Sequence, residues 1–225
     1  FVAVLLSLLL IRMPAAEPRQ TRHDEGVGAG IRYAWSHATV RNSLLLCGVV
    51  TLANAPPLVL GPFIADGIFH RGATGLGILM AAFGLGATLG VARLASRKSS
   101  AGMQQVAGHG ALFYCAALLV YALAPWYWLV VAAAFAAGYA FFRQNAANNA
   151  LIQAVIEERF RGRVMSFYTM MAVGMIPIGS FLAGWAATFA GPRPVLAAAA
   201  ILSGAAGLAF LHYTRPLDNP LCSAN

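Results

Sequence analysis

The chain has 225 residues, of which 60% are hydrophobic and only 10% are charged. Soluble domains carry about 45–50% apolar and about 25% charged residues, so this composition excludes a water-soluble enzyme and favours an integral membrane protein. The net charge of +8 would suggest a nucleic-acid partner in a soluble protein, but here the basic residues lie between apolar runs. We therefore expect no nucleic-acid partner and interpret the basic residues as a topology signal.

An apolar segment and a polar linker come first in the chain. Phe1–Ile11 is too short to cross a bilayer, so we interpret it as the end of a transmembrane helix that begins upstream, which makes the chain a fragment. Residues 12–41 are predicted to form a cytoplasmic linker. Its last part, Ile31–Arg41, mixes aromatic and basic residues. That part is either a short helix lying in the membrane interface or an ordinary polar connection.

Six longer apolar segments follow, each with the roughly 20 residues that a membrane-spanning helix needs. Helices are expected rather than strands, because backbone groups in lipid must pair within the segment. The predicted fold is all-α, a polytopic membrane bundle over residues 42–213 followed by a cytoplasmic tail at 214–225. The predicted spans are 42–64, 74–95, 104–124, 126–149, 163–189 and 194–213.

The basic residues orient these spans. If the linker is cytoplasmic, then among the 15 Lys and Arg residues only Arg71 and Arg193 fall on the opposite side, and Arg143 lies inside a span. So strong a bias over short loops is the positive-inside pattern. Six spans after a cytoplasmic linker also return the C-terminus to the cytoplasm, so the count of spans and the charge pattern agree.

Polar residues inside the spans are the candidates for contact with a substrate, because polar groups are costly against lipid. The fourth span is the richest, and its Arg143 either snorkels to the interface or lines an inward-facing vestibule that attracts an anionic group. The amides of this span are either contacts between helices or contacts with a ligand. The substrate-binding candidates are Asn54, Tyr139, Arg143, Gln144, Asn145 and Asn148, and Asn149 lies beside them.

Prolines and glycines interrupt three of the spans. Pro56 and Pro57 remove backbone hydrogen bonds near the middle of the first span, which predicts a kink or break. Such a break either lines a binding cavity or is a packing kink without a ligand. Pro177 predicts a similar bend in the fifth span. Gly86 and Gly90 form a GxxxG pattern that lets two helix backbones approach closely.

Ionisable and catalytic groups are scarce in the spans. No Asp or Glu lies deep in any of them, so a carboxylate for proton coupling is expected in a missing N-terminal part. The three cysteines are far apart, which supports neither a zinc site nor a disulfide framework. Nucleotide-binding, metalloprotease and hydrolase motifs are absent from the sequence. We therefore predict a protein that is not an enzyme and uses no cofactor or metal.

Two stretches of the chain resemble the major facilitator superfamily. Glu25–Arg41, EGVGAGIRYAWSHATVR, is similar to the short helix that members place before their seventh span. Asn148–Gly184 contains Glu158, Arg161, Gly162 and Arg163 followed by Val-Met, which is similar to an acid-x-x-Arg-Gly-Arg-Val-Met pattern, and then Pro177. The closest likeness is to the bacterial branch of transmembrane secretion effectors and enterobactin-exporter-like efflux proteins.

This resemblance implies the C-terminal half of a twelve-helix secondary transporter in a bacterial inner membrane. The six helices would form two inverted three-helix repeats that rock against a missing N-terminal six-helix half. The implied activity is efflux of a small amphipathic molecule, such as a siderophore or drug-like compound, with proton coupling as an option. A non-transporting membrane scaffold or assembly subunit is the alternative.

The basic cytoplasmic loops supply candidates for a gate. The loop after the second span keeps Arg93, Arg97 and a lysine but lacks the Asp that the superfamily often carries there. Our hypothesis is that Glu158, Arg161 and Arg163, with Gly162 between the two arginines, form an ionic latch at the cytoplasmic rim. The alternative is a basic loop that only sets topology. The candidate gate residues are Arg93, Arg97, Glu158, Arg161, Gly162 and Arg163.

Overall fold

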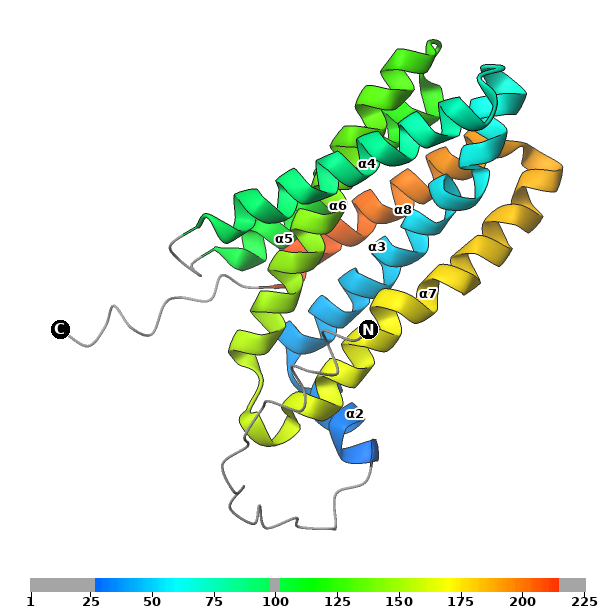
Figure 1. The fold of residues 1–225 in the computed structure, drawn as a ribbon. Helices are drawn as coiled ribbons and strands as arrows, with labels where there is room; N and C mark the ends of the chain where they lie inside the picture. Colours follow the sequence, from blue (N-terminus) through cyan, green and yellow to red (C-terminus); the bar gives the residue numbers. More distant parts are fainter. Residues whose placement is uncertain (1–26, 98–101, 215–225) are drawn as a thin grey trace, which may run out of the picture.

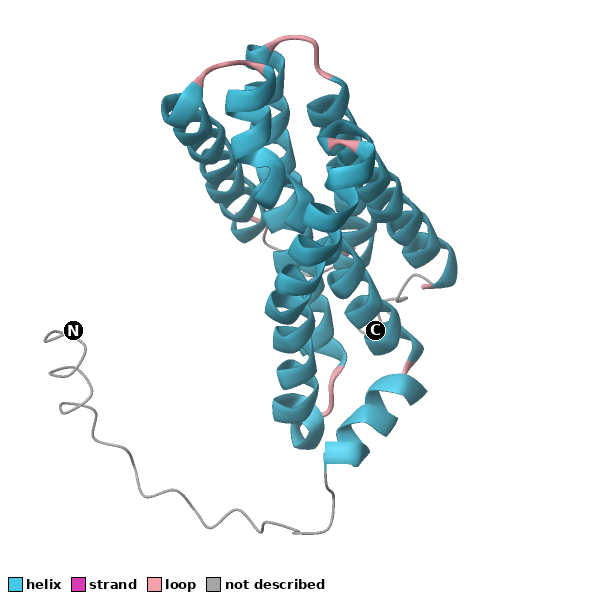
Figure 2. Cartoon of the chain, turned by 90° about the vertical axis from the view of Figure 1, so that its right-hand side faces the viewer, coloured by secondary structure: helices cyan, strands magenta, loops and turns pink. Residues whose placement is uncertain are grey.

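Helices account for all the regular secondary structure in the part of the chain that the structure describes, residues 27–97 and 102–214 (Figures 1 and 2). The structure is a computed structural model. The predicted truncated span at Phe1–Ile11, the linker up to residue 26 and the tail from residue 215 lie outside the described residues. What is described is the predicted all-α polytopic bundle.

Six long helices follow one short helix in the predicted order. The observed bounds are α2 Val27–Ser36, α3 Ala38–Pro62, α4 Gly72–Ala95, α5 Met103–Leu123, α6 Tyr127–Val155, α7 Arg161–Ala190 and α8 Pro192–Tyr213. Two short helical segments, η1 Phe63–Ile68 and η2 Glu158–Phe160, extend α3 and precede α7. The α7–α8 connection is a single residue, Gly191, whose φ of 78° favours glycine, and Pro192 then begins α8.

Two boundaries differ from the sequence prediction. Helix α3 begins at Ala38 rather than at residue 42. The chain bends at His37, and residues 38–41, which the prediction assigned to the linker, already belong to α3. Helix α6, the fourth predicted span, continues to Val155, six residues beyond its predicted end at 149. The prediction ended this span at its polar residues, because such residues are unfavourable in a helix that faces lipid. They do not end a helix that packs against protein, and the burial of Leu151 and Ile152 shows that this part of α6 is packed in that way.

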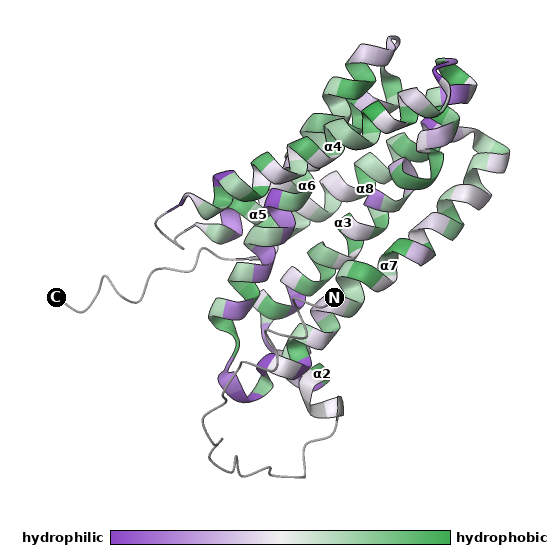
Figure 3. Cartoon of the chain, in the orientation of Figure 1, coloured by the Kyte–Doolittle hydropathy of each residue, from purple (hydrophilic) through white to green (hydrophobic). Residues whose placement is uncertain are grey.

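Five helices of the described part are long and apolar enough to cross a membrane, and α6 is not among them. Its 29 residues suffice for a span, but Arg143 and the amides that follow lower its hydropathy. Figure 3 shows this contrast, with hydrophilic residues along one half of α6 and at the ends of the bundle. Contacts with α3, α4 and α5 shield α6, so it needs less apolar surface than a helix that faces lipid.

The helix pairs have an internal symmetry. Helix α3 packs on α6, α7 and α8, helix α6 packs on α3, α4 and α5, and α5 packs on α8. This set of pairs is unchanged if α3, α4 and α5 are exchanged with α6, α7 and α8. The two three-helix units run in opposite directions through the bundle, because three helices, an odd number, separate the start of the first unit from the start of the second. The packing therefore has the pattern of an inverted repeat.

Glycines let the paired helices approach closely. A Cβ atom on Gly86 of α4 would lie 2.0 Å from the carbonyl oxygen of Phe135 on α6, and one on Gly138 of α6 would lie 2.0 Å from that of Phe83 on α4. A Cβ atom on Gly90 would lie 2.4 Å from the carbonyl oxygen of Tyr139. The GxxxG pattern of α4 thus packs directly on α6, as its spacing predicts.

Helix α7 is the most exposed long helix. It lies along α3 at the edge of the bundle (Figure 1), and only 11% of its most apolar stretch is buried, against 61% for α3. Phe181 and Trp185 are among its exposed side chains. This apolar surface needs lipid or another helical partner to cover it.

Candidate functional site

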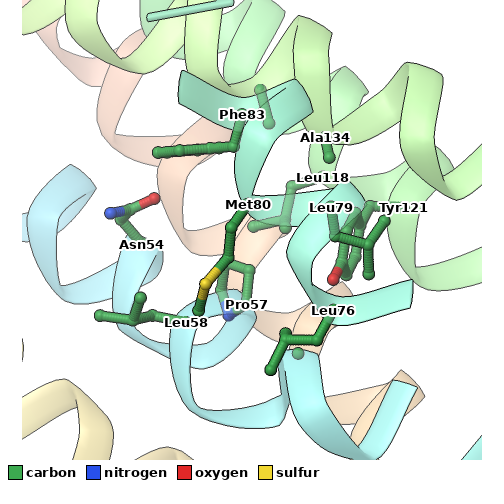
Figure 4. Close-up of a pocket in the computed structure, with 12 residues that line it drawn as sticks. Asn54, Pro57, Leu58, Leu76, Leu79, Met80, Phe83, Leu118, Tyr121 and Ala134 are labelled. Carbon is green, nitrogen blue, oxygen red and sulfur yellow. The ribbon is translucent and has the colours of Figure 1, made fainter. Parts of the chain in front are cut away.

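An apolar pocket lies between α3, α4, α5 and α6. Its volume is about 160 Å³, and it occupies the half of the bundle that contains the α3–α4 and α5–α6 connections (Figure 4). With the linker in the cytoplasm, this half faces outward. The pocket is lined by Asn54, Pro57, Leu58, Gly61, Leu76, Leu79, Met80, Phe83, Leu118, Tyr121, Ala134 and Ala137.

Asn54 is the one predicted substrate contact that lines this pocket. The hydroxyl of Tyr114, which is fully buried on α5, donates a hydrogen bond of 2.9 Å to Asn54 Oδ1. This bond fixes the orientation of the amide and leaves its Nδ2 hydrogens without a protein acceptor among the described residues.

The paired prolines do not break α3. The α-helix is continuous through Pro56 and Pro57, although each ring removes a bond to the carbonyl four residues earlier. The carbonyl freed by Pro57 belongs to Ala53, and the Tyr114 hydroxyl lies 3.5 Å from it. The carbonyl freed by Pro56 belongs to Leu52 and faces Gly179 of α7, where a Cβ atom would lie 2.7 Å from it. The Tyr114 hydroxyl thus offers a replacement donor to the Ala53 carbonyl, and Gly179 lets α7 pack closely on the Leu52 carbonyl.

The bend expected at Pro177 does not interrupt α7, which is one helix from Arg161 to Ala190. Gly179, two residues later, is the point of close approach to α3. Pro177 therefore lies next to a packing contact and lines neither of the two pockets described here.

A second, more polar cleft lies in the opposite half of the bundle, between α4, α6 and α7. Its volume is about 640 Å³ and it is open to the surroundings. Tyr168 of α7 is buried and donates a 3.0 Å hydrogen bond to the backbone carbonyl of Asn145. The side chains of Asn149 and Gln153 are hydrogen-bonded to each other along α6. The cleft is lined by Val91, Phe142, Asn145, Ala146, Asn149, Ala150, Gln153 and Tyr168.

Two of the predicted contacts are buried between helices rather than in a pocket. Gln144 is fully buried against Gly110 of α5, and both polar atoms of its amide lack hydrogen-bond partners. Asn148 is also fully buried and donates a 2.8 Å bond to the backbone carbonyl of Ser43 on α3. The Asn148 bond thus joins α6 to α3, whereas the Gln144 amide lies at the α5–α6 contact without a hydrogen-bond partner.

Tyr139 and Arg143 lie on another face of α6. The guanidinium of Arg143 lies 5.8 Å from the centre of the Tyr139 ring, and that ring contacts Phe113 of α5 edge to face. Neither residue lines the two pockets. The six predicted contacts therefore do not converge on one site, because they occupy different faces of two helices.

The charged residues of the α6–α7 connection pair locally. Arg161 Nη1 and Glu158 Oε1 are 3.2 Å apart, and both side chains are about half exposed or more. Arg159 pairs with Glu157 in the same short loop. Arg163 packs beside Gly30 of α2, and Gly162 has open space around it. Arg93 and Arg97 lie at the C-terminal end of α4 and are exposed.

The short helix α2 docks on the α6–α7 connection. The ring of Tyr33 stacks on Phe160 with centroids 4.3 Å apart, and its hydroxyl accepts a bond from the backbone N–H of Glu157. The connection before α3 is thus helical and attached to the α6–α7 loop. Its helical part is Val27–Ser36 rather than Ile31–Arg41.

Several residues that line the pockets were absent from the sequence prediction. Tyr121 lines the apolar pocket, and Tyr114, which bonds to Asn54, lies seven residues before it and therefore on the same face of α5, which is a signal that the sequence contained. Met80 and Phe83 are ordinary apolar residues of α4, and nothing in their pattern distinguishes them from lipid-facing residues. Within the described residues, no group of three or more His, Cys, Asp or Glu side chains is placed to hold a metal ion.

A family model described as transmembrane secretion effector, within the major facilitator superfamily, matches residues 1–220. No curated protein and no solved structure matches the chain.

Proposed function

Because this chain belongs to the transmembrane secretion effector family of the major facilitator superfamily, we propose that it exports a small amphipathic molecule by alternating access. The family consists of membrane transporters, and the chain is a multi-pass membrane protein. The proposal adds a direction, a class of substrate and a mechanism. It also places the chain in a bacterial inner membrane with a cytoplasmic C-terminus.

The observation that carries the proposal is the pair of cavities along α6. The polar cleft in the cytoplasmic half ends at Phe142, and the apolar pocket in the outer half begins at Ala137. Five residues of helix correspond to about 7.5 Å. A solute with a polar part and an apolar part matches two such neighbouring environments, and both of them involve α4 and α6.

Alternating access needs a second bundle for this one to move against. The inverted-repeat pattern of the helix pairs supports such a motion, because exchanging the two three-helix units interchanges inward-facing and outward-facing arrangements. The exposed apolar face of α7 provides surface for the missing N-terminal six-helix half. A proton-coupling carboxylate would belong to that half, since the carboxylates of the described residues lie outside the helix middles.

The proposal is tested by measuring export in cells that carry or lack the intact gene. Cells lacking it should accumulate a catecholate siderophore or a neutral lipophilic dye to a higher level, and the gene on a plasmid should restore export. Asn145→Leu should slow export without lowering the amount of protein in the membrane, because the side chain lines the cleft. Equal retention of all compounds in both strains contradicts export.

A scaffold or assembly subunit is the second candidate function. The observation that favours it is the pairing of interior polar groups from helix to helix, as in Asn148 with Ser43 and Gln104 with the carbonyl of Thr214. The polar cleft also does not continue through the bundle, since the outer pocket is apolar. If the scaffold is correct, Asn145→Leu changes no flux, whereas loss of the chain destabilises a partner complex.

The ionic latch is part of the transport proposal. The Arg161–Glu158 pair is present but lies within one turn, so as a latch it would have to exchange partners during the cycle. Arg161→Ala should slow export and leave membrane insertion unchanged. Unaltered flux in this variant would remove the latch and leave the loop with a role in topology alone.

A further inference from the structure

The outer pocket between α3 and α6 carries two polar groups in a wall that is otherwise apolar. Tyr121 is one of them. Its side chain is only 5% exposed, and its hydroxyl makes no hydrogen bond within the described part of the chain, although the residue lines the pocket. The hydroxyl oxygen is not among the fully buried unpartnered atoms of the described residues, so it is open to the pocket that the residue lines and can donate a hydrogen bond to a molecule there.

Asn54 is the second polar group. In Figure 4 its amide lies at one side of the pocket and Tyr121 lies at the other, with Met80 and Pro57 between them. Because Tyr114 occupies Asn54 Oδ1, the amide group that remains is the Nδ2 donor. Both polar groups of the pocket can therefore donate a hydrogen bond to an acceptor.

The pocket has no charged lining residue. A charged group would lose its hydration there without gaining a counter-charge, so an uncharged ligand is favoured. The volume of about 160 Å³ is close to that of apolar protein cavities that hold one aromatic ring. Leu58 and Met80, each 52% exposed, form a rim beyond which a larger molecule can extend.

We propose that this pocket binds uncharged, largely apolar molecules that carry a hydrogen-bond acceptor such as a ketone, with the acceptor held by the hydroxyl of Tyr121 and with Asn54 as a second donor at the opposite side of the pocket. This inference rests on the proposed export function, for which it names the substrate class. The acceptor distinguishes such molecules from hydrocarbons, and the absence of a carboxylate in the wall distinguishes them from lipophilic cations.

The probe for this site is benzophenone, an uncharged ketone that forms covalent adducts with nearby C–H groups on illumination. The full chain in nanodiscs is illuminated with increasing benzophenone, and adducts are mapped by mass spectrometry. We expect saturable labelling at Met80 and Leu58. Adducts spread over exposed side chains of α7 such as Phe181, with no saturable component at the pocket, would overturn the proposal.

Variants and competitors test the acceptor. Tyr121→Phe removes only the hydroxyl, and we expect the benzophenone concentration for half-saturation to rise about fivefold, as for loss of one hydrogen bond. Asn54→Leu, at the opposite side of the pocket, should raise it less, because the probe has a single acceptor. Tyr168→Phe, in the other cleft, is the matched control and should leave labelling unchanged. Wild-type labelling in both pocket variants would overturn the assignment of the acceptor.

Competition separates the ligand classes. Dibenzyl ketone should protect the pocket from labelling, whereas diphenylmethane and tetraphenylphosphonium at equal membrane concentrations should not. Equal protection by diphenylmethane would mean that an apolar shape alone is recognised and would overturn the proposal. Export without saturable labelling would overturn the proposed binding site and leave the proposed export function standing. Saturable labelling without export would overturn the export function alone.

Discussion

Replacing Gly86 by alanine tests how closely α4 must approach α6. The added Cβ would lie 2.0 Å from the carbonyl oxygen of Phe135 and 2.9 Å from the amide nitrogen of Tyr139. Optimal contacts of carbon atoms lie at about 3.5–4.0 Å, so the helices must separate by about 1.5 Å. Overpacking of this kind costs about 1–3 kcal/mol.

Gly84 provides the matched control on the same helix. A Cβ at Gly84 meets no atom within 4 Å. Both substitutions gain about the same helix propensity, about 1 kcal/mol, so the difference between Gly86→Ala and Gly84→Ala isolates the clash. A difference of about 2 kcal/mol corresponds to a melting temperature that is about 4–8 °C lower for Gly86→Ala.

The assay uses the thiol of Cys47, which is fully buried. With Cys115→Ala and Cys222→Ser in the background, Cys47 is the remaining cysteine of the three. A fluorogenic maleimide then reports unfolding in detergent as temperature rises. Gly86→Ala melting at or above the temperature of Gly84→Ala would refute the close packing of α4 on α6.

Two further substitutions test other contacts. Tyr33→Ala removes the ring stacked on Phe160, so the amides of α2 should exchange hydrogen for deuterium faster while those of α3 do not; unchanged exchange in α2 would show that the stack does not hold it. Asn148→Leu removes the bond to the Ser43 carbonyl, and hydrogen bonds between membrane helices average about 0.6 kcal/mol, so the melting temperature should fall by only about 1–3 °C. Failure of this variant to fold would mean that the amide does more than join two helices.

The architecture was predictable from the sequence because each helix is indicated by a long apolar segment, so an error at a few residues does not change the prediction. Apolar length sets the helices, and Gly86 and Gly90 correctly predict a close helix contact. The fourth span is instructive, since its polar half lowers the hydropathy of α6 without ending the helix. A helix surrounded by protein follows packing rules rather than the rules for lipid exposure, and the sequence alone does not say which helix is surrounded.

The site was less predictable, because the polarity of a side chain suggests a functional role but does not say which neighbouring helix or pocket the side chain faces. Gln144 and Asn148 are polar and central, yet they face neighbouring helices. Tyr121 faces the pocket, and its aromatic ring made it look like an ordinary core residue. Successive residues of a helix are turned by about 100°, so a polar run distributes its members over different neighbours.

The orientation of α4 tests the central claim, that apolar helices cross the bilayer with their basic connections on one side. Arg71 and Arg97 are exposed at its two ends, and its 24 residues span about 36 Å. With each replaced by cysteine in a cysteine-free chain, a membrane-impermeant thiol reagent on intact cells should label position 71 and should reach position 97 only after permeabilisation. Labelling of both positions from the same side would contradict the account.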